Sequence, residues 1–135
     1  MECDKAKALE YVEKYNQRYH TEFVPLTPYH LFPDENGECE FENQSWPGNE
    51  RAGVYLILSK DDEILYVGES NSLGRRFYSY FRSDNGKCIV LSENWSKEPY
   101  AIISIPAPDD RRYERLSLEE YLIQNLRPID NIRGK

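Results

Sequence analysis

The spacing of hydrophobic residues along the chain predicts three helices and three strands. Apolar side chains recur at helical spacing near the N-terminus, where Asp4 can cap the first turn, and again in two later segments. Short runs of β-branched and aromatic residues, bounded by turn residues, predict the strands. In chain order, the predicted elements are a helix at 4–19, strands at 53–58 and 64–67, a helix at 72–81, a strand at 100–105 and a helix from Asp109 or Asp110 to Leu126.

The order of these elements indicates the fold class. The polar residues 59–63 are short enough to join the first two strands as a hairpin, while prolines end the third strand and the last helix. We therefore expect an α+β fold, with a small three-stranded, mostly antiparallel sheet flanked by helices.

Residues 21–50 are expected to form irregular chain that packs on the core. They are rich in Pro, Gly, Asn and acidic residues, but they also contain isolated rings that a flexible linker would lack, namely Phe23, Tyr29, Phe32, Phe41 and Trp46. Residues 83–98 are polar and predict no element. We divide the chain into an N-terminal helix with an acidic extension, residues 1–50, and a domain at residues 51–135.

Composition limits the class of protein. A length of 135 residues suits one domain, and no apolar run approaches the ~20 residues of a membrane span. The charged N-terminus lacks an apolar signal core, so we expect a cytoplasmic protein without a membrane partner. Three widely spaced cysteines, with no C-x-x-C pair, predict reduced thiols and argue against a zinc site.

The net charge of −7 is unevenly distributed. Residues 1–50 carry four Lys/Arg and eleven Asp/Glu, whereas residues 51–135 carry thirteen of each. Nucleic-acid-binding proteins usually present excess positive charge. The acidic N-terminal part therefore counts against that class, and the neutral remainder permits it.

One acidic residue of the last predicted helix stands out. On a helical wheel, Glu119 falls at the centre of an apolar face formed by Tyr113, Leu116, Leu122, Ile123 and Leu126. A carboxylate among apolar side chains is costly unless it is paired or binds a cation. The alternative, in which Glu119 simply reaches solvent, is about equally favoured by the wheel.

An arginine pair lies in the predicted helix at 72–81. Arg75 and Arg76 point in different directions, and Arg76 shares a face with Tyr80. A guanidinium beside a phenolic hydroxyl suits a phosphate oxygen, although two surface arginines on an amphipathic helix are the commoner explanation. Gly68 and Gly74 do not form a phosphate loop, because five residues separate them and no Lys-Ser/Thr follows.

Several short motifs together resemble the GIY-YIG endonuclease family. They are "GVYLI", "YVGES", an arginine ten residues after Tyr66, and "LEEYLIQNLRPIDN". The family includes the nuclease part of the bacterial excision-repair subunit, homing endonucleases and some restriction enzymes. The resemblance spans residues 52–131 and does not extend to residues 1–50.

The resemblance implies a set of site residues. It places Arg76 at the arginine that contacts the scissile phosphate, and Glu119 at the single metal-binding glutamate. The other implied site residues are the motif tyrosines Tyr55 and Tyr66, the following Tyr80, and Asn131, which helps to hold the site together.

The same resemblance implies hydrolysis of phosphodiester bonds in DNA, with RNA open as a substrate. One Mg²⁺ or Mn²⁺ at Glu119 would assist, Arg76 would stabilise negative charge, and Tyr55 or Tyr66 would orient or deprotonate water. Glu69 departs from the pattern, because repair-type relatives have a lysine there, and its charge is expected to weaken DNA binding.

Two other interpretations remain open at this stage. In one, the domain is a catalytically weak or inactive module, derived from a nuclease, that binds nucleic acid or protein. In the other, the acidic segment 34–50 covers the site or recruits a protein partner of an active nuclease.

Overall fold

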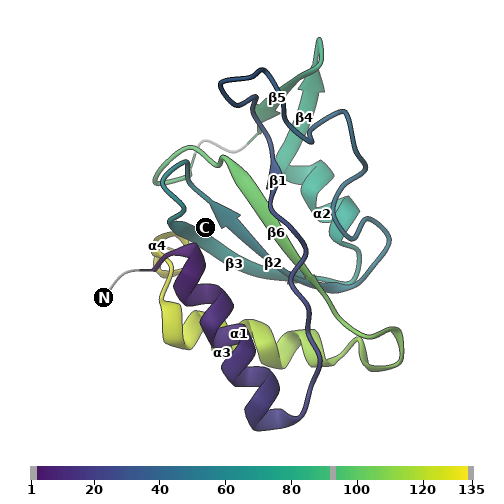
Figure 1. Ribbon diagram of the computed structural model, residues 1–135, viewed down its shortest axis with the longest axis vertical. Helices are drawn as coiled ribbons and strands as arrows, with labels where there is room; N and C mark the ends of the chain where they lie inside the picture. Colours follow the sequence, from purple (N-terminus) through teal and green to yellow (C-terminus); the bar gives the residue numbers. More distant parts are fainter. Residues whose placement is uncertain (1–2, 92–93, 134–135) are drawn as a thin grey trace.

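The computed structural model describes residues 3–91 and 94–133, and its elements form an α+β architecture (Figure 1). Four antiparallel strands form the main sheet in the order β1-β6-β2-β3, and β4 and β5 form a separate hairpin. The elements are α1 (Lys5–Tyr19), β1 (Tyr29–His30), β2 (Gly53–Leu58), β3 (Ile64–Ser70), α2 (Leu73–Tyr80), β4 (Phe81–Asp84), β5 (Lys87–Val90), β6 (Ala101–Pro106), the 3₁₀ helix η1 (Asp109–Arg111), α3 (Glu114–Leu126) and α4 (Ile129–Ile132).

The predicted fold class is confirmed, but the predicted number of strands in the sheet is wrong. The fourth strand, β1, comes from the segment expected to be irregular and pairs Tyr29 with Ile102 of β6. A strand of two residues is too short to show a period of two, so only its tertiary pairing defines it.

The β4–β5 hairpin was also absent from the prediction. It follows α2 directly, and residues Asn85 and Gly86 form its turn with φ angles of 53° and 78°. Two consecutive left-handed residues are typical of the tight turns whose twist matches that of a β-hairpin.

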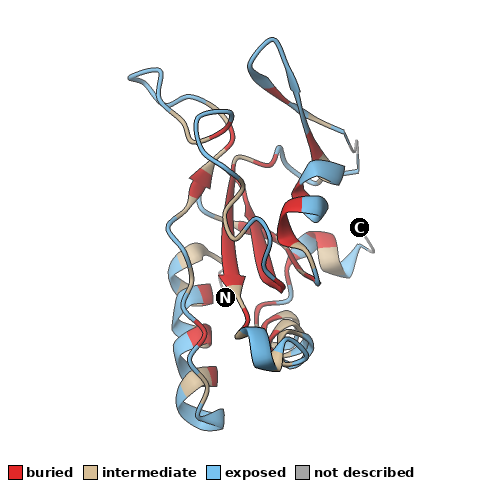
Figure 2. Ribbon diagram, turned by 90° about the vertical axis from the view of Figure 1, so that its right-hand side faces the viewer, coloured by how far each residue is buried: buried red, intermediate tan, exposed pale blue. Residues whose placement is uncertain are grey.

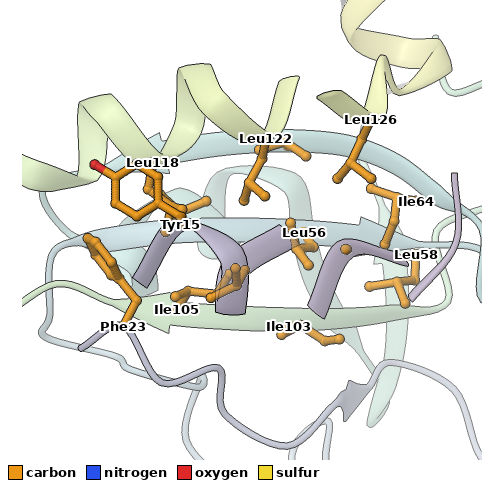
Figure 3. Packing of buried hydrophobic residues seen from close by; sticks show 14 of the residues in the cluster. Tyr15, Phe23, Leu56, Leu58, Ile64, Ile103, Ile105, Leu118, Leu122 and Leu126 are labelled. Carbon is orange, nitrogen blue, oxygen red and sulfur yellow. The ribbon is translucent and has the colours of Figure 1, made fainter. Parts of the chain in front are cut away.

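The central strand β2 is buried on both faces, so its successive side chains enter two different cores. On one face, Leu56 and Leu58 pack with α1 and α3, as Figure 3 shows with Tyr15, Leu118 and Leu122 in the same cluster. Asp4 caps α1 by accepting a hydrogen bond from the backbone N–H of Lys7 at 2.9 Å, as the sequence predicts.

The opposite face of the sheet is covered by α2, the start of β4 and rings of the N-terminal extension. Tyr55 and Ile57 of β2 pack there with Phe77 and Phe81. Aromatic side chains anchor the extension: Tyr29 and Phe41 are enclosed in this core, and Trp46 packs against it. Phe23 is enclosed in the other core, where its ring contacts that of Tyr15.

The predicted apolar face of the last helix is only partly correct, because Leu122 and Leu126 are buried but Tyr113 and Leu116 are not. Its buried side chains are Leu118, Leu122 and Leu126, whereas Leu116 and Tyr113 are 50% and 67% exposed. The helix also begins later than expected, because η1 precedes it. Because α3 contacts both the sheet and α1, its buried stripe is rotated by about one residue relative to the face that the helical wheel predicts. Glu119 therefore lies at the border of the stripe rather than at its centre.

Among the described residues, no helix has the length and apolar character needed to cross a membrane. The three cysteines, Cys3, Cys39 and Cys88, are all free thiols.

Candidate active site

The two motif tyrosines lie on adjacent strands of the sheet. Tyr55 of β2 pairs directly with Gly68 of β3, and Tyr66 stands two residues before that glycine, with its ring 6.2 Å from the ring of Tyr55. A Cβ atom added at Gly68 would lie 2.4 Å from both Cζ and Oη of Tyr55. The glycine is therefore required so that the buried phenol ring can lie across β3.

Helix α2 brings Arg76 and Tyr80 to the same place. The hydroxyls of Tyr55 and Tyr80 are 2.8 Å apart and share a hydrogen bond, and Nη1 of Arg76 donates to Oη of Tyr55 at 3.5 Å. The start of α2 is fixed by the backbone N–H of Gly74, which donates to the carbonyl of Asn49 at 2.9 Å. These contacts join the guanidinium and the two hydroxyls in one cluster.

The tyrosine hydroxyls are difficult to ionise in this arrangement. Burial, together with the neighbouring Tyr80, raises the pKa of Tyr55 far above the ordinary value of about 10. Burial also raises the pKa of Tyr66, with Tyr80 and Glu119 acting in the same direction. Burial lowers the pKa of Arg76, but its contacts with Tyr55 and Tyr80 outweigh burial, and the net pKa is raised.

Glu119 approaches this cluster from α3. Burial raises the pKa of Glu119 to about 7, with the charges of Glu69 and Glu120 acting in the same direction and that of Arg76 opposing them. The carboxylate forms no hydrogen bond or ion pair with any described residue. Although α2 and α3 cover opposite faces of the sheet, the charge of Arg76 thus lies within electrostatic range of the Glu119 carboxylate.

Glu69, the residue that departs from the family pattern, is held by an ion pair. Its Oε1 atom lies 2.8 Å from Nε of Arg115, and the two side chains are only 27% and 18% exposed. Arg115 therefore compensates much of the negative charge that was expected to oppose a phosphate.

Asn131 contacts the backbone of the site and none of its charged groups. Its Oδ1 accepts from the N–H of Val67 at 2.8 Å, and its Nδ2 donates to the carbonyl of Val67 at 2.9 Å. Because β3 is an edge strand, this side chain takes the place of a neighbouring strand and fixes α4 against the residue between Tyr66 and Gly68.

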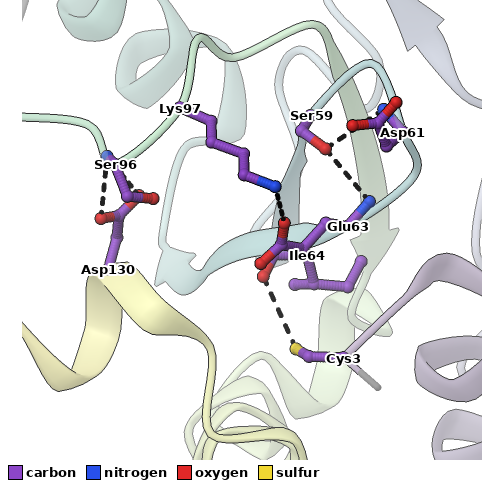
Figure 4. Close-up of polar contacts among 8 residues, drawn as sticks. All are labelled: Cys3, Ser59, Asp61, Glu63, Ile64, Ser96, Lys97 and Asp130. Carbon is purple, nitrogen blue, oxygen red and sulfur yellow. Dashed lines mark hydrogen bonds and ion pairs between the residues drawn. The ribbon is translucent and has the colours of Figure 1, made fainter.

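A residue that the sequence reasoning missed completes the cluster. The ring of Trp95 lies 6.1 Å from that of Tyr66 and 5.6 Å from that of Tyr80, edge-on to both. Figure 4 shows how the following residues are held, with Ser96 donating to the buried carboxylate of Asp130 and Lys97 paired with the glutamate of the β2–β3 turn. No local pattern marks Trp95, because distant residues place it.

The capacity for a cation rests on Glu119. The described residues contain no group of three or more His, Cys, Asp or Glu side chains arranged to hold a metal ion. A half-buried carboxylate with no partner and a raised pKa fits a single divalent ion, because Mg²⁺ commonly uses one or two carboxylates and keeps several waters.

Of the residues predicted for the site, the structure therefore joins Tyr55, Tyr80 and Arg76 by hydrogen bonds. Tyr66 adjoins them through ring contacts, and Glu119 adjoins them electrostatically. Asn131 supports the strand instead of facing the cluster. Arg75 is exposed and makes no contact with this group.

Comparison with known proteins gives a consistent match. The family model described as the GIY-YIG catalytic domain matches residues 51–133. The UvrABC system protein C of Methanothermobacter thermautotrophicus is 34% identical over 84 residues, which are 62% of this chain and 14% of the relative. The proteins of the same name from Mesoplasma florum and Prochlorococcus marinus are 36% and 39% identical over 83 and 82 residues, covering 61% and 59% of this chain and 13% and 12% of theirs.

The chain thus spans about one seventh of the length of these relatives, and the likeness lies in one domain. The matched segment contains both strands of the β2–β3 hairpin, α2, α3 and Asn131, which are the elements that build the cluster. The chain belongs to the GIY-YIG catalytic domain family.

Proposed function

We propose that this chain is a divalent-metal-dependent endonuclease that hydrolyses phosphodiester bonds in DNA. The observation that carries the proposal is the hydrogen-bonded group of Arg76, Tyr55 and Tyr80, with the ring of Tyr66 beside it and the partnerless, half-buried carboxylate of Glu119 within electrostatic range. Hydrolysis of a phosphodiester needs positive charge at the phosphoryl oxygens and an oriented water, and this group of side chains can supply both.

Arg76 is the phosphate-binding residue in this proposal. Its guanidinium is charged at physiological pH, like that of any arginine, and the contacts with Tyr55 and Tyr80 raise its pKa further. It can donate further hydrogen bonds to a phosphoryl oxygen as negative charge accumulates there. Tyr55 is fully buried and already engaged, so it positions Arg76 and Tyr80 rather than meeting water.

Tyr66 is the better candidate for orienting the attacking water. It is only partly buried, and its pKa is raised, so it acts as a hydrogen-bonding group and not as a phenolate at neutral pH. In the reaction, the water oxygen bonds to phosphorus and releases a proton to solvent, the bond from phosphorus to one sugar oxygen breaks, and that sugar oxygen takes up a proton from solvent.

Glu119 would hold the cation. A bound Mg²⁺ or Mn²⁺ supplies Lewis acidity and lowers the pKa of a coordinated water. Glu119 itself would provide one anionic oxygen ligand, and the negative charges of Glu69 and Glu120 nearby would favour a bound cation.

The test is nicking of supercoiled and branched DNA in the presence of Mg²⁺ or Mn²⁺. Glu119→Gln and Arg76→Ala are each expected to lower the rate by about a hundredfold or more. Matched controls are the exposed neighbours, Glu120→Gln and Arg75→Ala, which should remain close to wild type. If the control of either pair loses as much activity as the site variant, the assigned residue is wrong.

A second candidate function is nucleic-acid or protein binding without catalysis. The net charge of −7 favours it. Glu69, which stands where repair-type relatives have a lysine, is a weaker argument for it, because its charge is paired with that of Arg115. A protein that binds DNA with a steep salt dependence but nicks none under any tested metal would support this alternative.

The acidic segment 34–50 is proposed as a surface for a protein partner and not as a cover over the site. Trp46 packs against Phe77 and Phe81, and a cavity of about 380 Å³ lies between the segment and the α2–β4 junction. Within the described part of the chain, the segment forms no hydrogen bond or ion pair with Arg76 or Glu119. Removal of its acidic charges should therefore leave the nicking rate unchanged while weakening the binding of such a partner.

A further inference from the structure

One part of this acidic protein is positively charged. Residues 70–91, which contain α2 and the β4–β5 hairpin, carry four Lys/Arg against a single acidic residue, Asp84. The rest of the chain carries thirteen Lys/Arg against 23 Asp/Glu. The positive segment begins beside the catalytic cluster and continues away from it.

The cations of this segment also form no close ion pairs within the part of the chain that the structure describes. Most Lys and Arg side chains elsewhere pair with carboxylates: Lys5, Lys7, Lys14, Arg51, Lys97, Arg111, Arg115 and Arg133. By contrast, Arg75, Arg76, Arg82 and Lys87 form no ion pair with any residue that the structure describes. They remain available for an external anion.

The hairpin has two different faces. Its register pairs Arg82 with Ile89 and Asp84 with Lys87, so these four exposed side chains share the outer face. The inner face carries the buried Phe81 and Cys88 and contacts the acidic segment through a hydrogen bond from Ser83 to Glu42. Positive charge and acidic chain therefore lie on opposite sides of the hairpin.

The hairpin is fixed relative to the site. β4 starts at the residue that follows α2, and the N–H of Leu91 donates to the carbonyl of Tyr80 at 2.8 Å. Figures 1 and 2 show the hairpin projecting from the end of α2, exposed beyond a buried base. At about 3.3 Å per residue, Arg82 lies about 7 Å along the strand from Tyr80, and Lys87 lies opposite a residue about 7 Å further on.

We propose that the outer face of the β4–β5 hairpin binds the DNA backbone on one side of the cut, with Arg82 and Lys87 contacting two separate phosphates of one strand. This rests on the proposed function. Since a DNA strand rises about 3.4 Å per nucleotide, the two cations would reach phosphates about two and about four nucleotides from the scissile bond. Contacts of this kind position a duplex and carry no base specificity.

The test is the salt dependence of DNA binding, measured by fluorescence anisotropy with a labelled duplex. All proteins carry Glu119→Gln, so that the DNA stays intact. Arg82→Ala/Lys87→Ala is expected to weaken binding at low salt by tenfold or more, and to reduce the slope of log affinity against log salt by about 2.

The matched control is Arg18→Ala/Lys60→Ala. These two cations also lack an ion pair with a described residue, and they rest on the rings of Tyr19 and Tyr100, away from the hairpin. The control changes the net charge equally, so its slope should stay close to that of the parent. An unchanged slope in the hairpin variant, or an equal loss in the control, would overturn the proposal.

Activity separates this inference from the proposed function. With wild-type Glu119, the hairpin variant should show a raised KM and a retained kcat, because Arg82 and Lys87 do not touch the reacting atoms. If the wild-type protein cuts no DNA while the salt slopes of the hairpin variant and its Glu119→Gln parent differ as expected, the endonuclease proposal fails and the binding surface stands. If the wild-type protein cuts DNA and the two slopes are equal, only the binding surface fails. Melting temperatures equal to the parent confirm that the exposed substitutions leave the fold intact.

Discussion

Replacement of Gly68 by alanine is a direct test of how the site is built. The new methyl group would lie 2.4 Å from Cζ and Oη of Tyr55 and 2.8 Å from Cε1. Real contacts of this kind need about 3.4 Å or more, so the ring or the strand must move by about 1 Å. The ring of Tyr55 is 0% exposed and has Phe77 and Tyr80 on its sides, so little free space exists for it.

Two opposing effects determine the sign of the change in stability. Alanine in a strand is favoured over glycine by about 0.5–1 kcal/mol, because glycine loses more conformational freedom on folding. Overpacking a full core costs about 1–3 kcal/mol. Gly68→Ala is therefore expected to lower the free energy of unfolding by about 1–2 kcal/mol, whereas the same change without a clash would raise it.

Activity should suffer more than stability. Displacement of the ring by about 1 Å would break the 2.8 Å contact between the hydroxyls of Tyr55 and Tyr80 and move Arg76 with them. Misplacement on that scale can reduce a rate by about a hundredfold. The nicking rate of Gly68→Ala should thus fall by one to two orders of magnitude under conditions in which the protein is fully folded.

A double-mutant cycle with Tyr55→Leu identifies the cause. In the leucine background no ring faces the new methyl group, so Gly68→Ala should cost nothing or stabilise slightly, as measured by urea unfolding. An equal cost in both backgrounds would show that the ring is not responsible. Retained stability and retained nicking in the single variant would refute the account of this glycine.

Three further expectations concern the remaining groups. The raised pKa of Glu119 means that the folded state holds a proton that the unfolded state releases between pH 4.5 and about 7, so metal-free wild type loses stability across that window. Glu119→Gln should accordingly be more stable than wild type at pH 8 but not near pH 4. A difference in free energy of unfolding between the two proteins that is the same at both pH values, measured with urea, would contradict this. Asn131→Ala removes two hydrogen bonds to a strand edge and should cost about 1–3 kcal/mol in urea unfolding; a change within error would show that water replaces the amide. Ser96→Ala removes a hydroxyl bonded to Asp130, and it should alter the fluorescence of Trp95 with a loss of about 1 kcal/mol, while an unchanged spectrum would mean that the ring is held by other contacts.

The parts of the fold that local pattern specifies were predictable. The first helix, with its Asp4 cap, and the β2–β3 hairpin follow from spacing within one segment. The β4–β5 hairpin was missed even though its Asn85-Gly86 turn is a strong hairpin signal, because the flanking strands are short and polar. The strand at Tyr29–His30 could not be predicted, since only its partner β6 defines it.

In the site, too, features set by local motifs were predictable and features set by distant contacts were not. Motif order pointed to Arg76 and Glu119, yet the helical wheel placed the apolar face of α3 one position away, because the wheel treats a helix as having one partner and α3 has two. Trp95 lies in a loop that is fixed by Asp130, 35 residues later in the sequence, so no spacing within the loop could reveal it. Whether these residues act as proposed remains a prediction for the variants above.

The position of the cluster at the edge of the sheet has a physical reason. A central strand such as β2 is buried on both faces and can present nothing to a large, charged substrate. At the edge strand β3, side chains from α2 on one face and α3 on the other can converge, and one side of the strand stays open. The open side would also expose unpaired backbone groups, and Asn131 satisfies the N–H and the carbonyl of Val67 between the two motif residues. An edge closed by one amide side chain, rather than by a further strand, thus keeps the register of β3, and it is the edge at which the proposed phosphodiester substrate would approach.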